Sequence, residues 1–136
     1  MRIFAAVLVA GLLAAGSATI ASSHPSSSGQ NAVSVRLKEM RVTASPQTVE
    51  SGRVLFTARN MGSVIHELVV VRTSRPLPVR GYRAVEPKGA SIGEIEDIEP
   101  GQAKKVTLTL KPGNYLLLCN IVGHYQLGMT TSLVVR

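Results

Sequence analysis

The sequence predicts an all-β protein, folded as a Greek-key β-sandwich of about seven strands. Two observations support this prediction. Apolar and polar residues alternate in several short stretches, which is the pattern of half-buried strands. Gly, Pro, Asn and Ser residues separate these stretches as turn signals, and no convincing helical pattern lies between them. Many short strands joined by short turns are typical of a sandwich.

The N-terminus has the pattern of a secretory signal peptide. Met1 and Arg2 give a positive start, residues 3–16 are apolar, and small residues follow. We predict that residues 1–21 are a signal peptide, cleaved after Ala18 or Ala21, and that the protein is periplasmic or otherwise exported. The alternative is an uncleaved N-terminal helix that anchors the chain, because residues 3–21 approach the roughly 20 residues that span a bilayer.

Residues 22–32 are polar and rich in serine, and we predict a flexible tether there. After cleavage at Ala21, His24 would be the third residue of a free amino terminus, an arrangement that can bind square-planar copper(II) or nickel(II). The serine-rich composition also explains this segment without any metal. The remainder, residues 33–136, has the length of one domain with a single core.

The first predicted strand has Val33, Val35 and Leu37 on one face. The next apolar positions are Met40 and Val42, so the alternation is shifted by one residue. Such a shift predicts a bulge at which the strand passes from one sheet to the neighbouring one.

A second strand is predicted over residues 54–58, and a turn at residues 60–62 leads to the apolar run 64–71. His66 shares a face with Val64, Leu68 and Val70, so its imidazole should point into the interior near one end of the sheet. The alternative is a core histidine whose ring is hydrogen-bonded to a backbone carbonyl.

Residues 73–91 are rich in Pro and Gly, which predicts a long loop. The overlapping stretch of residues 72–88 is the most basic part of the chain. This loop is either merely solvated or a docking surface. The acidic residues 92–99 predict a short helical turn or an irregular edge strand. The last three strands of the sandwich are predicted over residues 106–110, 115–119 and 129–135.

Cys119, His124 and Met129 lie in one short segment, with four residues between Cys119 and His124 and four between His124 and Met129. Thiolate, imidazole and thioether groups are soft to borderline donors, which hard cations do not favour. Two histidines and a cysteine with a weak axial methionine form the blue-copper type of site. The segment supplies three of these groups, so a second histidine is needed, and His66 is a better candidate than His24 because it lies in a predicted strand.

Cys119 is the only cysteine in the chain. In an oxidising compartment it has no disulfide partner within its own chain, and binding a metal as thiolate would protect it. The alternative is a buried and inert cysteine that behaves as a small apolar residue. Met129 likewise has the alternative of simply filling the core.

Residues 60–70 and 112–129 together resemble the cupredoxin family of type 1 blue copper proteins. The two four-residue spacings are more similar to auracyanin and rusticyanin than to plastocyanin, and the resemblance covers roughly residues 33–136. One departure is Glu67, where plastocyanin has an asparagine. The resemblance implies one copper ion, cycling between Cu(I) and Cu(II), with His66, Cys119 and His124 as equatorial ligands and Met129 as the weak axial ligand.

The resemblance also implies how the site is supported and reached. Backbone amides of Glu67 and Asn120 would donate hydrogen bonds to the cysteine sulfur and tune its potential. His124 would lie at the exposed apolar end of the sandwich and conduct the electron out, with Ile121, Val122 and Leu127 around it.

We therefore expect an exported mononuclear copper protein that carries single electrons and is not an enzyme, since only His24 would remain to build a further copper centre. The alternatives are a periplasmic copper-handling protein, such as a chaperone or resistance component with the same ligands, and a metal-free interaction sandwich. Zinc suits His and Cys but gains little from a thioether.

The net charge of the whole chain is +7, and removal of Arg2 with the leader leaves 14 basic and 8 acidic residues, a net charge of +6. Such a surface favours acidic partners or anionic lipid headgroups. We expect redox partner proteins with acidic surfaces, no nucleic acid, no stable membrane insertion after cleavage, and a monomer.

Overall fold

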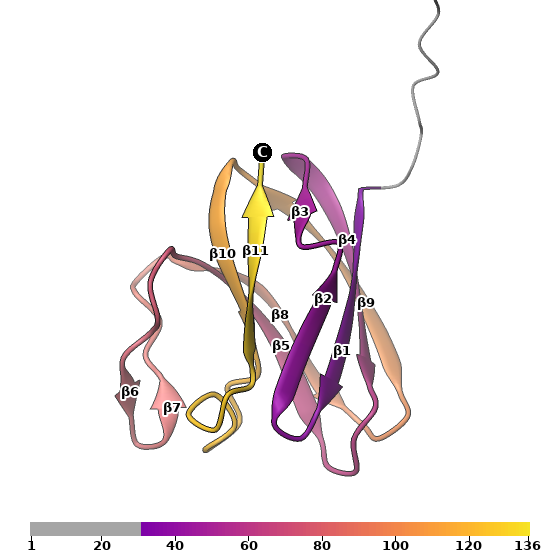
Figure 1. Cartoon of the computed structure of the whole chain (residues 1–136), viewed down its shortest axis with the longest axis vertical. Coiled ribbons are helices and arrows are strands. Elements are labelled where there is room, and N and C mark those ends of the chain that lie inside the picture. Colours follow the sequence, from indigo (N-terminus) through magenta and orange to yellow (C-terminus); the bar gives the residue numbers. More distant parts are fainter. Residues whose placement is uncertain (1–30) are drawn as a thin grey trace, which may run out of the picture.

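The computed structural model describes residues 31–136, which form two β-sheets packed face to face and one small separate hairpin (Figure 1). The predicted signal peptide, most of the predicted tether and His24 lie outside the described residues. Within residues 31–136, no helix is long and apolar enough to span a bilayer. The all-β sandwich predicted from the alternation is confirmed.

The first sheet has four strands in the order β2-β1-β4-β9. Their bounds are β1 Ala32–Lys38, β2 Arg41–Ser45, β4 Gly52–Asn60 and β9 Ala103–Leu110. Strand β1 is antiparallel to β2 and parallel to β4. Successive side chains of a strand point to opposite faces of the sheet. Buried residues alternate with more exposed ones along β1 and β4, so one face of this sheet lies against the core and the other faces solvent.

The second sheet has five strands in the order β3-β11-β10-β5-β8. Their bounds are β3 Thr48–Val49, β11 Thr130–Val135, β10 Gly113–Leu118, β5 His66–Arg72 and β8 Ser91–Ile98. Strand β5 lies between β10 and β8, and its residues 68–71 are all buried. The acidic stretch 92–99 thus forms an edge strand, which was one of its two predicted structures.

A core of buried side chains fills the space between the two sheets. Phe56 and Tyr115 are the largest fully buried side chains, and Leu68, Leu117 and Leu133 pack in the same cluster. Burying one such apolar side chain stabilises the fold by roughly 1.5–3 kcal/mol relative to leaving it exposed. Cys119 and Met129 belong to this cluster too, so the end of the core and the candidate metal site are continuous.

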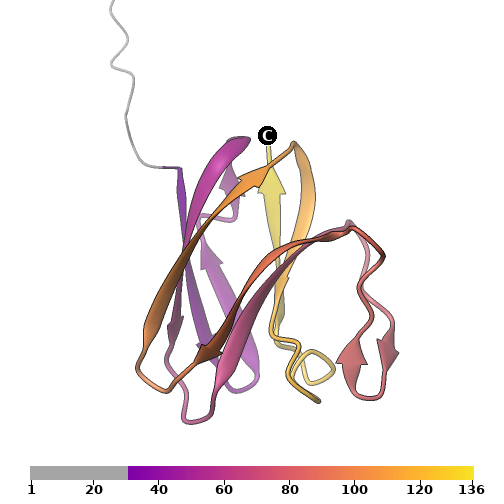
Figure 2. The same ribbon diagram turned by 180° about the vertical axis from the view of Figure 1, so that it is seen from behind.

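The small hairpin consists of β6 Val79–Arg80 and β7 Arg83–Ala84 and lies within the segment predicted as a long basic loop. Viewed from the front and from behind, it stands beside the sandwich (Figures 1 and 2). The amide of Gly123 donates a 2.7 Å hydrogen bond to the carbonyl of Tyr82, which ties the hairpin to the loop between β10 and β11.

Two details of the strand prediction need correction. The shift of alternation near Met40 is not a bulge that leads to the other sheet: residues 39–40 form a turn, and β2 returns antiparallel to β1 in the same sheet. The reversal of direction at this turn, rather than an inserted residue, changes which positions face inward. The two sheets also hold nine strands rather than about seven, because β2 and the two-residue β3 are separate strands.

Candidate metal centre

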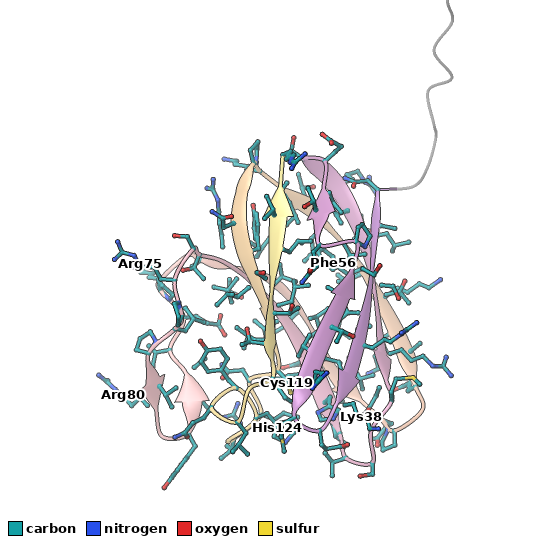
Figure 3. The ribbon with its side chains drawn as sticks, viewed as in Figure 1. Lys38, Phe56, Arg75, Arg80, Cys119 and His124 are labelled. Atoms are coloured by element: carbon teal, nitrogen blue, oxygen red, sulfur yellow. The ribbon has the colours of Figure 1, made fainter. Side chains whose placement is uncertain are left out.

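Three of the four predicted site residues lie at the ends of core strands, and the fourth lies in a loop. His66 is the first residue of β5, Cys119 directly follows β10, and Met129 directly precedes β11. His124 lies in the loop between β10 and β11. Cys119 and His124 are seen together at the lower end of the sandwich in Figure 3. Since the strands are neighbours in one sheet, the fold fixes both ends of this loop.

Three of the four side chains form a compact cluster. The ligand atoms of His66, Cys119 and His124 all lie within 4.8 Å of one another. Sγ of Cys119 is 3.3 Å from Nδ1 of His124 and 3.9 Å from Nδ1 of His66, and the two Nδ1 atoms are 3.3 Å apart. The cluster is shielded from water, since His66 and Cys119 are fully buried and His124 is 9% exposed.

This donor set fits a soft or borderline metal ion. Two Nδ1 atoms and one sulfur converge on a common point, and no carboxylate belongs to the cluster. Burial lowers the pKa of His66 and, with the nearby His66 ring, the pKa of His124, so both rings are held in the neutral form that binds metals. A trigonal arrangement of two imidazoles and a thiolate suits copper, and it also suits zinc.

Met129 is fully buried and lies against the cluster through its backbone. The amide of Cys119 donates to the carbonyl of Met129 over 3.1 Å, and the amide of Met129 donates to the carbonyl of His124 over 3.0 Å. Gly128, just before Met129, has a φ of 108°, a conformation that glycine adopts without strain. The structure therefore brings the chain at Met129 next to both Cys119 and His124.

The sulfur of Cys119 is supported by backbone amides, although one of them differs from the prediction. The amide of Glu67 donates to Sγ over 3.4 Å, as predicted. The amide of Asn120 instead donates to the carboxylate of Glu67 over 2.9 Å. Burial raises the pKa of the Cys119 thiol, and the backbone amides of Glu67 and Ile121 lower it.

Asn120 joins the loop between β10 and β11 to the small hairpin of β6 and β7. Its side-chain oxygen accepts a 2.7 Å hydrogen bond from the amide of Ala84, and its side-chain nitrogen donates to the Ala84 carbonyl over 3.1 Å. Arg83 donates to the carbonyl of Asn120 over 2.8 Å. Strand β7 thus holds Asn120 through both its side chain and its backbone carbonyl.

Glu39 was not predicted as a site residue. It lies in the turn between β1 and β2, and its Oε1 is 3.3 Å from Nε2 of the buried His66. Hydrogen bonds from its own amide and from the amides of Val64 and Ser63 lower the pKa of Glu39 to about 2, so this carboxylate is ionised. Nothing in the sequence near residue 39 signals this contact, because it joins a turn to the first residue of β5, far along the chain.

The loop before His66 is organised by Asn60, which is fully buried at the end of β4. Its side-chain nitrogen donates to the carbonyls of Val64 and Ile98 over 2.7 and 2.8 Å, and its side-chain oxygen accepts from the amide of Gly62 over 2.8 Å. These bonds satisfy all but one of the four hydrogen bonds that the buried amide can form. Asn60 thereby fixes the path of the chain into His66.

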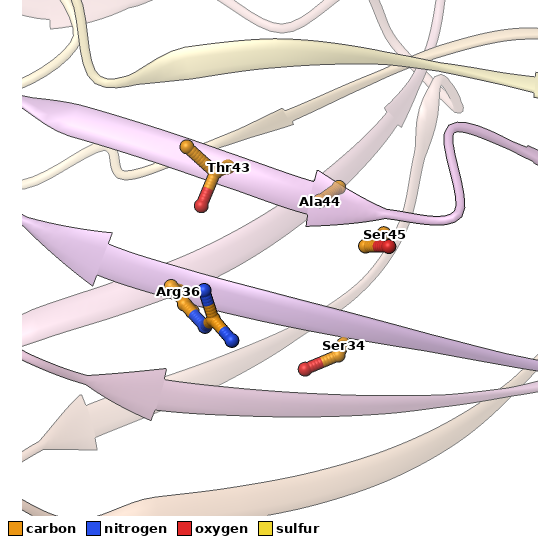
Figure 4. Close-up of a pocket in the computed structure, with 5 residues that line it drawn as sticks. All are labelled: Ser34, Arg36, Thr43, Ala44 and Ser45. Atoms are coloured by element: carbon orange, nitrogen blue, oxygen red, sulfur yellow. The ribbon is translucent and has the colours of Figure 1, made fainter.

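A hollow of about 440 Å³ lies elsewhere, on the β1 and β2 side of the molecule (Figure 4). Its lining consists of Ser34, Arg36, Thr43, Ala44 and Ser45, none of which belongs to the His-Cys-His cluster. The candidate metal centre, whose three clustered residues are buried, lies apart from this hollow at the end of the core.

No family model matches the sequence, and no curated protein matches it. Solved structures do match the fold. A reduced auracyanin from Roseiflexus castenholzii has a TM-score of 0.60 at 19% identity, covering 78% of this chain and 97% of that chain. Auracyanin A from Chloroflexus aurantiacus, described as a "blue" copper protein, has a TM-score of 0.57 at 22% identity, covering 77% and 98%.

Rusticyanin from Thiobacillus ferrooxidans matches with a TM-score of 0.57 at 16% identity, covering 78% of each chain. Residues 31–136 thus have the cupredoxin type of β-sandwich, as the resemblance of the two sequence segments implies. At these identities, the likeness establishes the fold. What the site binds has to be argued from its own residues.

Proposed function

We propose that this protein is an exported type 1 copper protein that carries one electron at a time between redox partners. One copper ion would be held by His66, Cys119 and His124, with Met129 as a further, weaker ligand. The observation that supports this most directly is the buried triangle of two Nδ1 atoms and one Sγ within 4.8 Å, on a sandwich similar to those of auracyanin and rusticyanin.

Copper in such a site supplies reversible one-electron chemistry, and the chain supplies a geometry that changes little between the two oxidation states. Cys119 and Met129 are linked by a backbone hydrogen bond at the ends of two paired strands. His66 begins a strand whose neighbours on both sides are hydrogen-bonded to it. Because neither strand end can move without breaking the sheet, little reorganisation accompanies electron transfer.

The electron leaves through His124, the least buried of the three clustered residues. Val122 and Leu127 in the same loop are 55% and 63% exposed, and Met61, Val64 and Ile65 in the loop before His66 are also exposed. An exposed apolar surface of this kind marks an interaction site. We propose that redox partners dock on these residues and exchange electrons with the copper through the imidazole.

We propose that charge around this surface selects partners with acidic surfaces. Arg75 and Arg80 point outward from the segment that contains the hairpin, and Arg80 lies on β6 itself (Figure 3). The solvent face of the four-stranded sheet is also basic, with Lys38 opposite Arg41 and Arg36 beside Arg59. Within residues 31–136, no Lys or Arg side chain pairs with a carboxylate, so these cations are left for external anions.

The first test is the visible and electron paramagnetic resonance spectrum of the protein after addition of copper(II). The proposal requires an intense thiolate-to-copper band and narrow copper hyperfine splitting, both lost in Cys119→Ala and both kept in Ser132→Ala, a change at an exposed position of β11. Absence of the band in the wild-type protein would refute the electron-carrier function. Rapid loss of copper to an acceptor protein, with a normal band, would point to copper handling instead.

A further inference from the structure

The carboxylate of Glu39 is held in place by the loop that precedes His66. Its Oε1 accepts hydrogen bonds from the amides of Ser63 and Val64 over 2.7 and 3.0 Å. These two contacts join the turn after β1 to the approach to β5, so the position of the carboxylate is set by two backbone segments. The Glu39 side chain is only 27% exposed.

Glycine at position 62 makes room for this carboxylate. A Cβ atom added at Gly62 would collide with both oxygens of Glu39. Gly62 is itself fixed by the hydrogen bond from its amide to Asn60. The close packing of a charged group against glycine backbone therefore leaves the carboxylate little freedom to move away from His66.

The outer nitrogen of His66 faces this carboxylate. Nδ1 of His66 points to Cys119 and His124, so the opposite ring atom, Nε2, carries the proton when Nδ1 binds a metal. Nε2 is buried and has no well-aligned hydrogen bond within the described residues. Oε1 of Glu39, 3.3 Å away but off the N–H direction, is the anion beside it.

We propose that Glu39 is a positioning residue for the copper site, an inference that rests on the proposed function. Its fixed negative charge holds His66 in the tautomer with the proton on Nε2 and orients the ring. The same charge stabilises the more positive Cu(II) state over Cu(I), and so lowers the reduction potential. A metal-bound histidine commonly has such a partner at its second nitrogen, which orients the ring and raises its basicity.

The test compares Glu39→Gln with Glu50→Gln in the full chain. Glutamine keeps an oxygen that can accept from Ser63 and Val64 and removes only the charge. Glu50 directly follows β3 at the end of the sandwich opposite Cys119, so its replacement removes the same charge far from the site (Figures 1 and 3). We expect Glu39→Gln to shift the Cu(II)/Cu(I) equilibrium about tenfold toward Cu(I), a rise of about 59 mV in potential, with Glu50→Gln nearly unchanged.

Two further measurements separate the possible results. Gly62→Ala should displace the carboxylate without removing its charge and should also raise the potential. In the metal-free chain, nitrogen NMR of His66 should show the proton on Nε2 in the wild type and a mixture of tautomers in Glu39→Gln. This readout does not need copper, so it tests the role of Glu39 even if the thiolate band is absent and the electron-carrier function fails.

Equal potentials for Glu39→Gln and Glu50→Gln in proteins with a normal thiolate band would overturn the inference and leave the proposed function intact. An unchanged His66 tautomer in Glu39→Gln would overturn it as well. A raised potential confined to Glu39→Gln and Gly62→Ala, with the altered tautomer, would establish it.

Discussion

The backbone amide of Glu67 donates a hydrogen bond to Sγ of Cys119, joining the second residue of β5 to a residue 52 positions later. The pairing of β5 with β8 shifts by one residue at this point, since His66 pairs with Ile98 but Leu68 pairs with Ile95. Two residues of β8 oppose Glu67, and one of them, Asp97, has a φ of 50°. The Glu67 amide is directed at the sulfur, which lies just past the end of the neighbouring strand β10.

The Glu67 side chain gives the first prediction. Its carboxylate accepts from the Asn120 amide over 2.9 Å and lies near the thiol, where its charge contributes to raising the pKa of Cys119, after the larger effect of burial. Glu67→Gln keeps an acceptor for Asn120 and removes the charge, so the thiol pKa should fall. Ultraviolet thiolate absorbance of the metal-free protein against pH measures this. An unchanged titration would show that the charge is screened.

Met129 provides a second prediction, which separates an axial ligand from a core residue. Met129→Leu preserves the buried volume, so it should cost less than about 1.5 kcal/mol of stability. Loss of the thioether donor should nevertheless raise the copper potential, because the axial ligand tunes it. Met40→Leu, at a partly buried methionine packed on the same core, is the control and should leave the potential unchanged. If both variants keep the wild-type potential, Met129 only fills space.

The pH dependence of stability should depend on Glu39. Its folded pKa of about 2 lies below the usual 4.5, so the unfolded state binds more protons between these values. The stabilisation by Glu39 is therefore complete above about pH 4.5 and is lost as the pH falls toward 2. Urea unfolding of the metal-free protein should show a wild-type advantage over Glu39→Gln at pH 7 that shrinks steadily below pH 4.5. A pH-independent difference would contradict this assignment.

The sandwich could be predicted from sequence because most of its strands are half-buried and alternate cleanly, as at Val54, Phe56 and Ala58. The clustering of Cys119, His124 and Met129 was visible because one loop carries all three. The contact of Glu39 with His66 could not be predicted, since it depends on how a turn meets a loop in space. The same holds for the bulge at Asp97, which depends on the register between β5 and β8.

The link between Asn120 and the hairpin predicts that the two move together. Asn120→Ala removes the hydrogen bonds to both backbone groups of Ala84 and should cost about 1–3 kcal/mol, because partly buried groups lose their partners. It should also speed the removal of copper by a chelator, since the loop after Cys119 loosens. Asn114→Ala, at an exposed position of β10, should change neither quantity. Equal effects of both substitutions in urea unfolding would rule out the coupling.

The basic hairpin region predicts faster encounter with anionic redox reagents. We expect Arg75→Glu combined with Arg80→Glu to slow reduction of the copper(II) protein by hexacyanoferrate(II) about tenfold at low salt, because an attractive field becomes repulsive near the electron exit. The difference should fade at high salt, where exposed charges are screened. The matched control is Arg53→Glu with Lys111→Glu, whose positions lie where β4 begins and β9 ends, near the C-terminal end of β11. Stopped-flow rates that fall equally for both pairs would mean that net charge, and not the hairpin, governs the encounter.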